Sequence, residues 1–166
     1  EDTPRGVNLR LSRTRPEFVA RLFEAEAPEI ADGVVVIENI AREAGSRTKI
    51  AVSSKEPNID PVGSCVGQRG IRVATVINEL GGEKIDIIEY ATDPAEFIRH
   101  AISPANVDKI ELHSDERQAS IYVNEDQFSL AIGKGGQNVR LAAKLTGWRL
   151  DIQPAKNGEA LEEGSE

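Results

Sequence analysis

The sequence is poor in the residues that build several common kinds of site. Of its 166 residues one is cysteine, none is methionine, two are histidine and only 4% are aromatic. A single cysteine, Cys65, excludes an internal disulfide and a cysteine-based metal cluster, so the simplest compartment is the reducing cytoplasm. His100 and His113 have no cysteine, aspartate or second histidine at metal-ligand spacing, so we expect no metal site and no cofactor.

Long hydrophobic runs and a net positive charge are also missing. No apolar run approaches the roughly 20 residues that a membrane helix needs, so we expect no membrane association. The formal net charge is −8, which is unusual for a protein that binds nucleic acid. The acids are concentrated, however: residues 16–33 hold five acids against one base, and residues 154–166 hold four against one. Residues 127–153 instead carry four basic residues against one acid, so positive charge gathers there.

The spacing of apolar residues and turns predicts a definite order of elements in the first half of the chain. In order, we expect a helix beginning at Pro16, strands at 34–41 and 48–53, a short apolar segment at 62–66, a glycine loop at 67–70, a helix at 71–80 and a strand at 85–88. A further short strand is expected at 7–11, where apolar and polar residues alternate.

The same order recurs in the second half, which indicates an internal repeat. Here we expect a helix beginning at Pro94, strands at 107–112 and 119–123, a helix at 125–132, a glycine loop at 133–136, a helix at 137–146 and a strand at 148–152. Gly67 and Gly133 are 66 residues apart, and so are Gly70 and Gly136.

The repeat predicts two similar domains, at 16–90 and 91–153. Residues 1–15 would then be a linker with the last part of a preceding domain. Residues 154–166 are acidic and poor in apolar side chains, so we expect a disordered tail. Because the sequence begins at Glu1 and contains no methionine, we expect a fragment of a longer protein.

Each repeat places a Gly-x-x-Gly loop between a short helix and a longer one. Glycines let the backbone approach another backbone closely. The helix that follows presents unpaired N–H groups and a partial positive charge, and together these features suit a phosphate group. Arg69 and Lys134 place a cation in the same space. One such loop could be only a flexible turn, but its repetition in the same element order favours a binding role.

The residues around both loops resemble those of a known family. Residues 58–73, with Asn-Ile-Asp-Pro-Val-Gly-Ser-Cys-Val-Gly-Gln-Arg-Gly-Ile-Arg-Val, and residues 78–80 resemble the first KH domain of the NusA family of bacterial transcription elongation and termination factors. Residues 131–142, with Ala-Ile-Gly-Lys-Gly-Gly-Gln-Asn-Val-Arg-Leu-Ala, resemble its second KH domain. The resemblance implies the α+β class: two tandem type II KH domains, each a three-stranded sheet covered by helices on one face.

The family also implies a partner, single-stranded RNA, which would be an A-rich nascent transcript. RNA polymerase would be contacted mostly through regions outside this chain, such as the family's polymerase-binding N-terminal domain, and the chain itself would be a monomer. The family's S1 barrel, apart from a last strand, would also lie outside the chain. The residues expected at the RNA are Gly67, Gln68, Arg69, Gly70, Arg72, Gly133, Lys134, Gly135, Gly136, Asn138 and Arg140. The residues expected to line grooves for the bases are Val66, Val73, Ile85 and Ile87, with Ile132, Val139, Leu150 and Ile152 in the second domain.

Two other interpretations stay open. The negative net charge would suit a protein-interaction scaffold that uses degenerate KH folds and does not bind RNA. A nucleotide-binding enzyme would need Gly-x-x-x-x-Gly-Lys-Ser/Thr after a strand, whereas Lys134 is followed by Gly135. No nucleophile–base pattern stands out, so we predict that the chain is not an enzyme. Cys65 and Trp148 are expected to be buried for packing.

Overall fold

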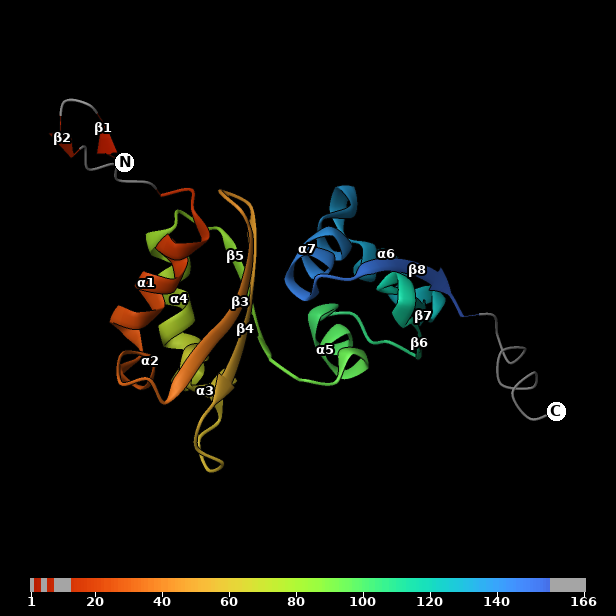
Figure 1. The fold of residues 1–166 in the computed structure, drawn as a ribbon, viewed down its shortest axis with the longest axis horizontal. Helices are drawn as coiled ribbons and strands as arrows, with labels where there is room; N and C mark the ends of the chain where they lie inside the picture. Colours follow the sequence, from red (N-terminus) through yellow and green to blue (C-terminus); the bar gives the residue numbers. More distant parts are fainter. Residues whose placement is uncertain (1, 4–5, 8–12, 156–166) are drawn as a thin grey trace.

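The structure of the chain, a computed structural model, describes residues 2–3, 6–7 and 13–155. The strand predicted at 7–11 therefore lies mostly outside the described residues, and so does most of the predicted tail. Val7 belongs to a two-residue antiparallel ladder between β1 (Asp2–Thr3) and β2 (Gly6–Val7). Two three-stranded sheets with their helices form the rest (Figure 1).

The first module is built around a sheet in which β4 is central. Its elements are α1 (Pro16–Glu26), α2 (Pro28–Ala31), β3 (Val35–Glu43), β4 (Arg47–Ser54), α3 (Pro61–Val66), α4 (Ile71–Glu79) and β5 (Lys84–Glu89). Strand β4 pairs antiparallel with β3 and parallel with β5. Helix α1 begins at Pro16 as predicted, because proline needs no amide partner in a first helical turn. The four-residue helix α2 was not predicted, since one turn is too short to show a helical period.

The second module repeats this topology. Its elements are α5 (Pro94–Ala101), β6 (Lys109–His113), β7 (Gln118–Val123), α6 (Glu125–Ile132), α7 (Gln137–Thr146) and β8 (Arg149–Pro154). Strand β7 pairs antiparallel with β6 and parallel with β8. The bounds predicted for α6 and α7 are those observed. The last strand runs beyond its predicted end at 152 to Pro154, the first residue of the predicted tail, because the amide of Ala155 still donates to the carbonyl of Val123 at 2.7 Å.

The core of the first module lies between its helices and one face of its sheet. It is made of Val19, Phe23, Val35, Ile50, Val52, Cys65 and Val76. Burial of Cys65 is confirmed, and it raises the pKa of the thiol to about 11, with the nearby Glu29 carboxylate acting in the same direction.

A second hydrophobic cluster crosses the boundary between the modules. It joins the helices of the second module, and the buried Trp148, to Ala41, Ala51 and Ile88 of the first sheet. Successive side chains of a strand point to opposite faces, and residues 48–52 of β4 are all buried. The first sheet is therefore covered by its own helices on one face and by α5 and α7 on the other (Figure 1).

Candidate functional site

The two glycine loops adopt the same backbone conformation. Gly67 has φ 77° and ψ 173°, and Gly133 has φ 79° and ψ 170°. The third position is left-handed in both loops, at φ 55° for Arg69 and 64° for Gly135. In each loop the fourth residue donates its amide to the carbonyl of the first at 3.1 Å. The sequence repeat is thus also a repeat of geometry.

The first glycine of each loop lies directly against the helix that follows. Its combination of φ and ψ is accessible essentially only to glycine. A Cβ atom on Gly67 would also lie 2.7 Å from Cγ of Arg72, and one on Gly133 would lie 2.7 Å from the backbone nitrogen of Asn138. Glycine is therefore required here both for the dihedral angles and for the close approach.

The third loop position, in contrast, points into open space. A Cβ atom on Gly135 would meet nothing within 4 Å. Arg69 occupies the equivalent position with a positive φ, which costs a non-glycine residue roughly 1–2 kcal/mol. The structure thus keeps a strained arginine at a position where glycine would fit without strain.

Two predicted cations remain available at the loops. The side chains of Arg69 and Lys134 are exposed, and within the described part of the chain neither makes a hydrogen bond or an ion pair. Arg72 is placed differently, since its Nη1 donates to Glu29 at 2.8 Å and to the carbonyl of Ser64 at 2.7 Å. Arg69 and Lys134 are therefore the cations that could meet a phosphate without breaking an internal pair.

Arg140 of α7 connects the second loop to the first module. Its Nε and Nη2 donate to the two carboxylate oxygens of Glu43 at 2.9 and 2.6 Å, and its Nη1 donates to the carbonyl of Gly135 at 3.0 Å. The hydrogen bonds from Arg140 lower the pKa of Glu43, so this carboxylate is ionised at neutral pH. Arg140 touches the loop, but each of its three guanidinium nitrogens already donates a hydrogen bond within the protein.

Asn138 lies inside the fold. It is fully buried, and its Nδ2 donates to the carbonyls of Ile102 at 3.0 Å and Ala131 at 2.9 Å. Its Oδ1 is buried and has no partner among the described residues. Because a side chain with no exposed area cannot touch a bound strand, we assign Asn138 to the support of the loop rather than to its surface.

The predicted groove residues all stay partly exposed. They lie on the helix before each loop, the helix after it and the following strand: Val66, Val73, Ile85 and Ile87 in the first module, and Ile132, Val139, Leu150 and Ile152 in the second. Among the described strands, β5 and β8 each pair on one side only, so each presents an open edge beside the predicted groove residues. Apolar surface with unpaired backbone groups therefore accompanies both loops.

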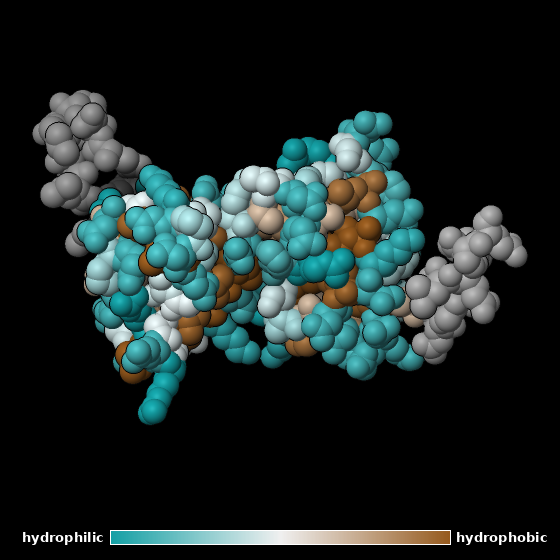
Figure 2. Space-filling view, turned by 90° about the horizontal axis from the view of Figure 1, so that it is seen from below, coloured by the Kyte–Doolittle hydropathy of each residue, from teal (hydrophilic) through white to brown (hydrophobic). Residues whose placement is uncertain are grey.

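Two exposed apolar residues beside the loops were missed by the sequence analysis. The side chain of Ile71, directly after Gly70, is 62% exposed, and that of Leu130, three residues before Gly133, is 45% exposed. An isoleucine at the first position of a helix, immediately after a glycine loop, was the available signal. In the view from below, hydrophobic surface is visible near the junction of the modules and over the second module (Figure 2).

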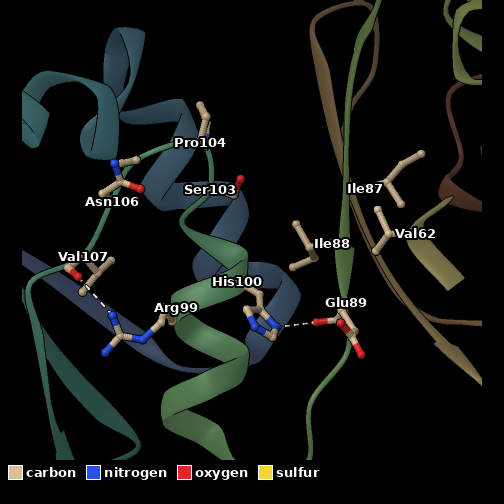
Figure 3. Close-up of a pocket in the computed structure, with 11 residues that line it drawn as sticks. Val62, Ile87, Ile88, Glu89, Arg99, His100, Ser103, Pro104, Asn106 and Val107 are labelled. Atoms are coloured by element: carbon tan, nitrogen blue, oxygen red, sulfur yellow. Dashed lines mark hydrogen bonds between the residues drawn. The ribbon is translucent and has the colours of Figure 1, made fainter. Parts of the chain in front are cut away.

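An open pocket of about 400 Å³ lies where the two modules meet (Figure 3). Ile88 of strand β5 faces the end of α5 and the segment after it, which form the opposite wall. Ile87 lies with Val62 on the other side of the strand. The Nδ1 atom of His100 lies 2.8 Å from the carbonyl of Glu89, and Arg99 donates to the carbonyl of Val107 at 3.0 Å. Ile87 is thus shared between this pocket and the residues predicted to line the groove of the first module.

Other chemistries find less support in the described residues. No three His, Cys, Asp or Glu side chains gather there so as to hold a metal ion. Gly133 follows helix α6, whereas a nucleotide-binding phosphate loop follows a strand. Among the helices of the described part, none combines the length and hydropathy that a membrane span requires.

Comparisons with known proteins match both modules. A model of the NusA-like first KH domain matches residues 13–90, and a model of the NusA-like second KH domain matches residues 94–160. Proteins named transcription termination/antitermination protein NusA are 50% identical over 97% of this chain in Halalkalibacterium halodurans and in Bacillus subtilis. The one from Thermus thermophilus is 49% identical over 94% of the chain. The chain spans 42%, 43% and 40% of the lengths of these three relatives.

One solved structure, the crystal structure of APE1850, has a similar fold. It superposes with a TM-score of 0.59 over 81% of this chain and 95% of that chain, at 24% sequence identity. At this identity the likeness concerns the fold alone. The two family models confirm the predicted fold class, two tandem KH domains.

Proposed function

We propose that this chain, which belongs to the NusA-like KH-domain family, binds single-stranded RNA through both of its glycine loops. One observation carries the proposal: the loops share one backbone conformation, and each presents an exposed cation, Arg69 or Lys134, that has no partner among the described residues. At Arg69 the shared loop geometry costs backbone strain, because a non-glycine residue there has a positive φ. A turn without a ligand would have no reason to keep such a strained geometry.

RNA phosphates would lie against Gly67–Gly70 and Gly133–Gly136. Gly70 and Gly136 are the N-cap residues of α4 and α7, and neither helix has a side-chain cap hydrogen bond. A phosphate oxygen can therefore accept from the loop and from the first helical turn, where the helix dipole favours negative charge. A KH loop of this kind clamps about four backbone nucleotides.

The bases would lie in the partly apolar grooves beside β5 and β8. Aliphatic side chains such as Val73 and Ile87 offer contact area, and the open strand edge offers N–H and C=O groups to the edges of the bases. Only 4% of the residues are aromatic, so recognition would depend less on stacking than in proteins with aromatic platforms. The family resemblance suggests a preference for A-rich RNA.

The two modules would share one RNA strand. Because the second site is held close to the first, its effective concentration is high and the affinity rises without further contacts. Two clamps of four nucleotides and a short connection give a footprint of roughly eight to ten nucleotides. The connecting nucleotides would pass the pocket between β5 and α5.

In its cellular context the chain would be the RNA-binding part of a bacterial transcription factor. Its relatives carry the name transcription termination/antitermination protein, and the chain spans about two fifths of their length. We infer that it acts as a monomer in the cytoplasm, on the nascent transcript of an elongation complex, with polymerase contacts mostly outside this chain. Its role would be binding rather than catalysis, without a cofactor.

Fluorescence anisotropy of a labelled A-rich RNA at low salt tests the proposal. Changing Lys134 and Gly135 to Asp places two carboxylates in the second clamp, and the matched change of Gln68 and Arg69 does so in the first. Each pair should weaken binding strongly while the circular dichroism and thermal unfolding stay close to those of the parent. If the parent shows no binding at tens of micromolar, the protein-scaffold interpretation replaces this one.

A further inference from the structure

The two loops differ in glycine content although they share a shape. The first has Gln68 and Arg69 between its glycines, whereas the second has Lys134 and Gly135 and therefore contains three glycines. Each added glycine widens the range of backbone conformations that a free loop can sample. Free of ligand, the second loop therefore has more conformations to lose than the first, so a bond that restrains Gly135 favours the clamp conformation.

Arg140 supplies such a constraint. Its Nη1 donates to the carbonyl of Gly135 at 3.0 Å, while the amide of Gly136 donates to the carbonyl of Gly133 at 3.1 Å. The peptide unit between Gly135 and Gly136 is therefore held at both its oxygen and its nitrogen. By the spacing of 66 residues, the first-module equivalent of Arg140 is Ala74, whose methyl group cannot form this bond. Among the described residues, this constraint is found at the glycine-rich loop and has no counterpart at the first loop.

The guanidinium of Arg140 is itself held by the other module. Its side chain is 45% exposed. Its other two nitrogens, Nε and Nη2, donate to the carboxylate of Glu43, the last residue of β3. Such a bidentate pair fixes the plane of the guanidinium as well as its position. Gln137 and Lys144 of the same helix also face the Glu43 carboxylate.

We infer that Glu43 of the first module is a positioning residue for the second clamp: through Arg140 it holds Gly135 and Gly136 in the conformation that receives a phosphate. This inference rests on the proposed RNA-binding function. The second clamp then depends on the docking of the two modules. The opposite arrangement, in which Glu43 competes with RNA for Arg140, predicts the opposite effect of removing the carboxylate.

The test uses the full chain with Gln68 and Arg69 changed to Asp, so that RNA affinity reports the second clamp. In this background Glu43→Gln should weaken RNA binding by about threefold to tenfold, although it removes a negative charge. Arg140→Lys keeps the positive charge for a phosphate but loses the fork, so it should weaken binding to a similar extent. Ser46→Ala removes another contact between the modules, the 2.6 Å bond from Gln137, and should leave the affinity unchanged.

Amide hydrogen exchange without RNA provides the second readout. The exchange of Gly136 should become faster in both variants, while that of Gly70, its equivalent in the first loop, should not change. Unchanged or tighter RNA binding by Glu43→Gln overturns the inference, as does an equal loss in Ser46→Ala. If Glu43→Gln does not fold, Arg140→Lys decides alone.

The same measurements separate this inference from the proposed function. If changing Lys134 and Gly135 to Asp leaves RNA affinity intact, the second loop is not a clamp and the proposed function fails at that loop. If that change abolishes binding while Glu43→Gln does not weaken it, only the role of Glu43 is wrong.

Discussion

The ammonium nitrogen of Lys49 lies 2.8 Å from Oδ2 of Asp86 and 2.7 Å from the carbonyl of Ser103, and the lysine side chain has no exposed area. Arg47 reaches the same carboxylate oxygen at 2.6 Å. Burial lowers the pKa of Lys49, and the neighbouring Asp86 opposes that effect. A buried cation that bonds to both modules thus forms part of their contact.

Asp86→Asn and Lys49→Met should differ sharply in their effects on stability. Asn at position 86 leaves two cations without their anion, and we expect a loss of about 2–4 kcal/mol in the free energy of unfolding, since Asp86 keeps some solvent contact. Met at position 49 keeps the volume and leaves Asp86 paired with Arg47, so we expect a change within about 1 kcal/mol. Urea unfolding measures both. Equal losses would show that the pair itself stabilises the fold.

Alanine at the first loop position should be far more damaging than alanine at the third. Gly133→Ala combines a forbidden conformation with a 2.7 Å approach to the backbone of Asn138, and we expect a loss of about 2–4 kcal/mol. Gly135→Ala meets nothing within 4 Å and takes a left-handed conformation, which costs about 1–2 kcal/mol. Thermal unfolding of the two variants checks the order, and equal losses would contradict the requirement for glycine at the first loop position.

The salt dependence of RNA binding should report the two free cations. Arg69→Ala and Lys134→Ala should each reduce the slope of log affinity against log salt by about 0.7, the value for one contact with single-stranded nucleic acid. Arg117→Ala is the matched control, because Arg117 donates to Gly147 at the opposite end of α7 and its loss changes the net charge equally. Equal slopes for all three variants would mean that overall charge, rather than contact, controls binding.

The buried thiol of Cys65 should make stability fall in alkaline solution. Its pKa is raised to about 11 in the folded protein, so the unfolded chain loses this proton at lower pH than the folded one. The stability that the buried neutral thiol contributes is fully present below the ordinary thiol pKa. As the pH rises toward 11, the free energy of unfolding should fall by about 2–3 kcal/mol in all. Comparison with Cys65→Ala isolates the effect of the thiol. The difference in unfolding free energy between the parent and Cys65→Ala should become smaller as the pH rises from the ordinary thiol pKa toward 11. A constant gap would contradict the assignment.

Much of the fold followed from local patterns. The bounds of α6 and α7 were predicted because apolar residues recur at helical spacing between clear glycine stops, and the repeat placed both loops in register. The features that were missed have no local signal. Helix α2 is a single turn, and Pro154 extends β8 through a bond made by its neighbour Ala155 to another strand.

The candidate site was predictable where it depends on the backbone and less so where it depends on distant partners. The Gly-x-x-Gly patterns that begin at Gly67 and Gly133 predict both loops from the sequence alone. The partner of Arg140, by contrast, is Glu43, 97 residues away, and Asn138 is buried against Ile102, 36 residues away. Counting charge in residues 127–153 could not show that one of its four cations is used to join the modules.

The cluster that contains Ala41, Ala51 and Ile88 has a consequence for how the chain unfolds. The remaining buried members of this cluster belong to the second repeat. A first module truncated at residue 90 would therefore expose an apolar sheet face, and Lys49 would lose its hydrogen bond to the carbonyl of Ser103. The two repeats should therefore unfold as one cooperative unit, because unfolding of either one exposes apolar surface of the other to water.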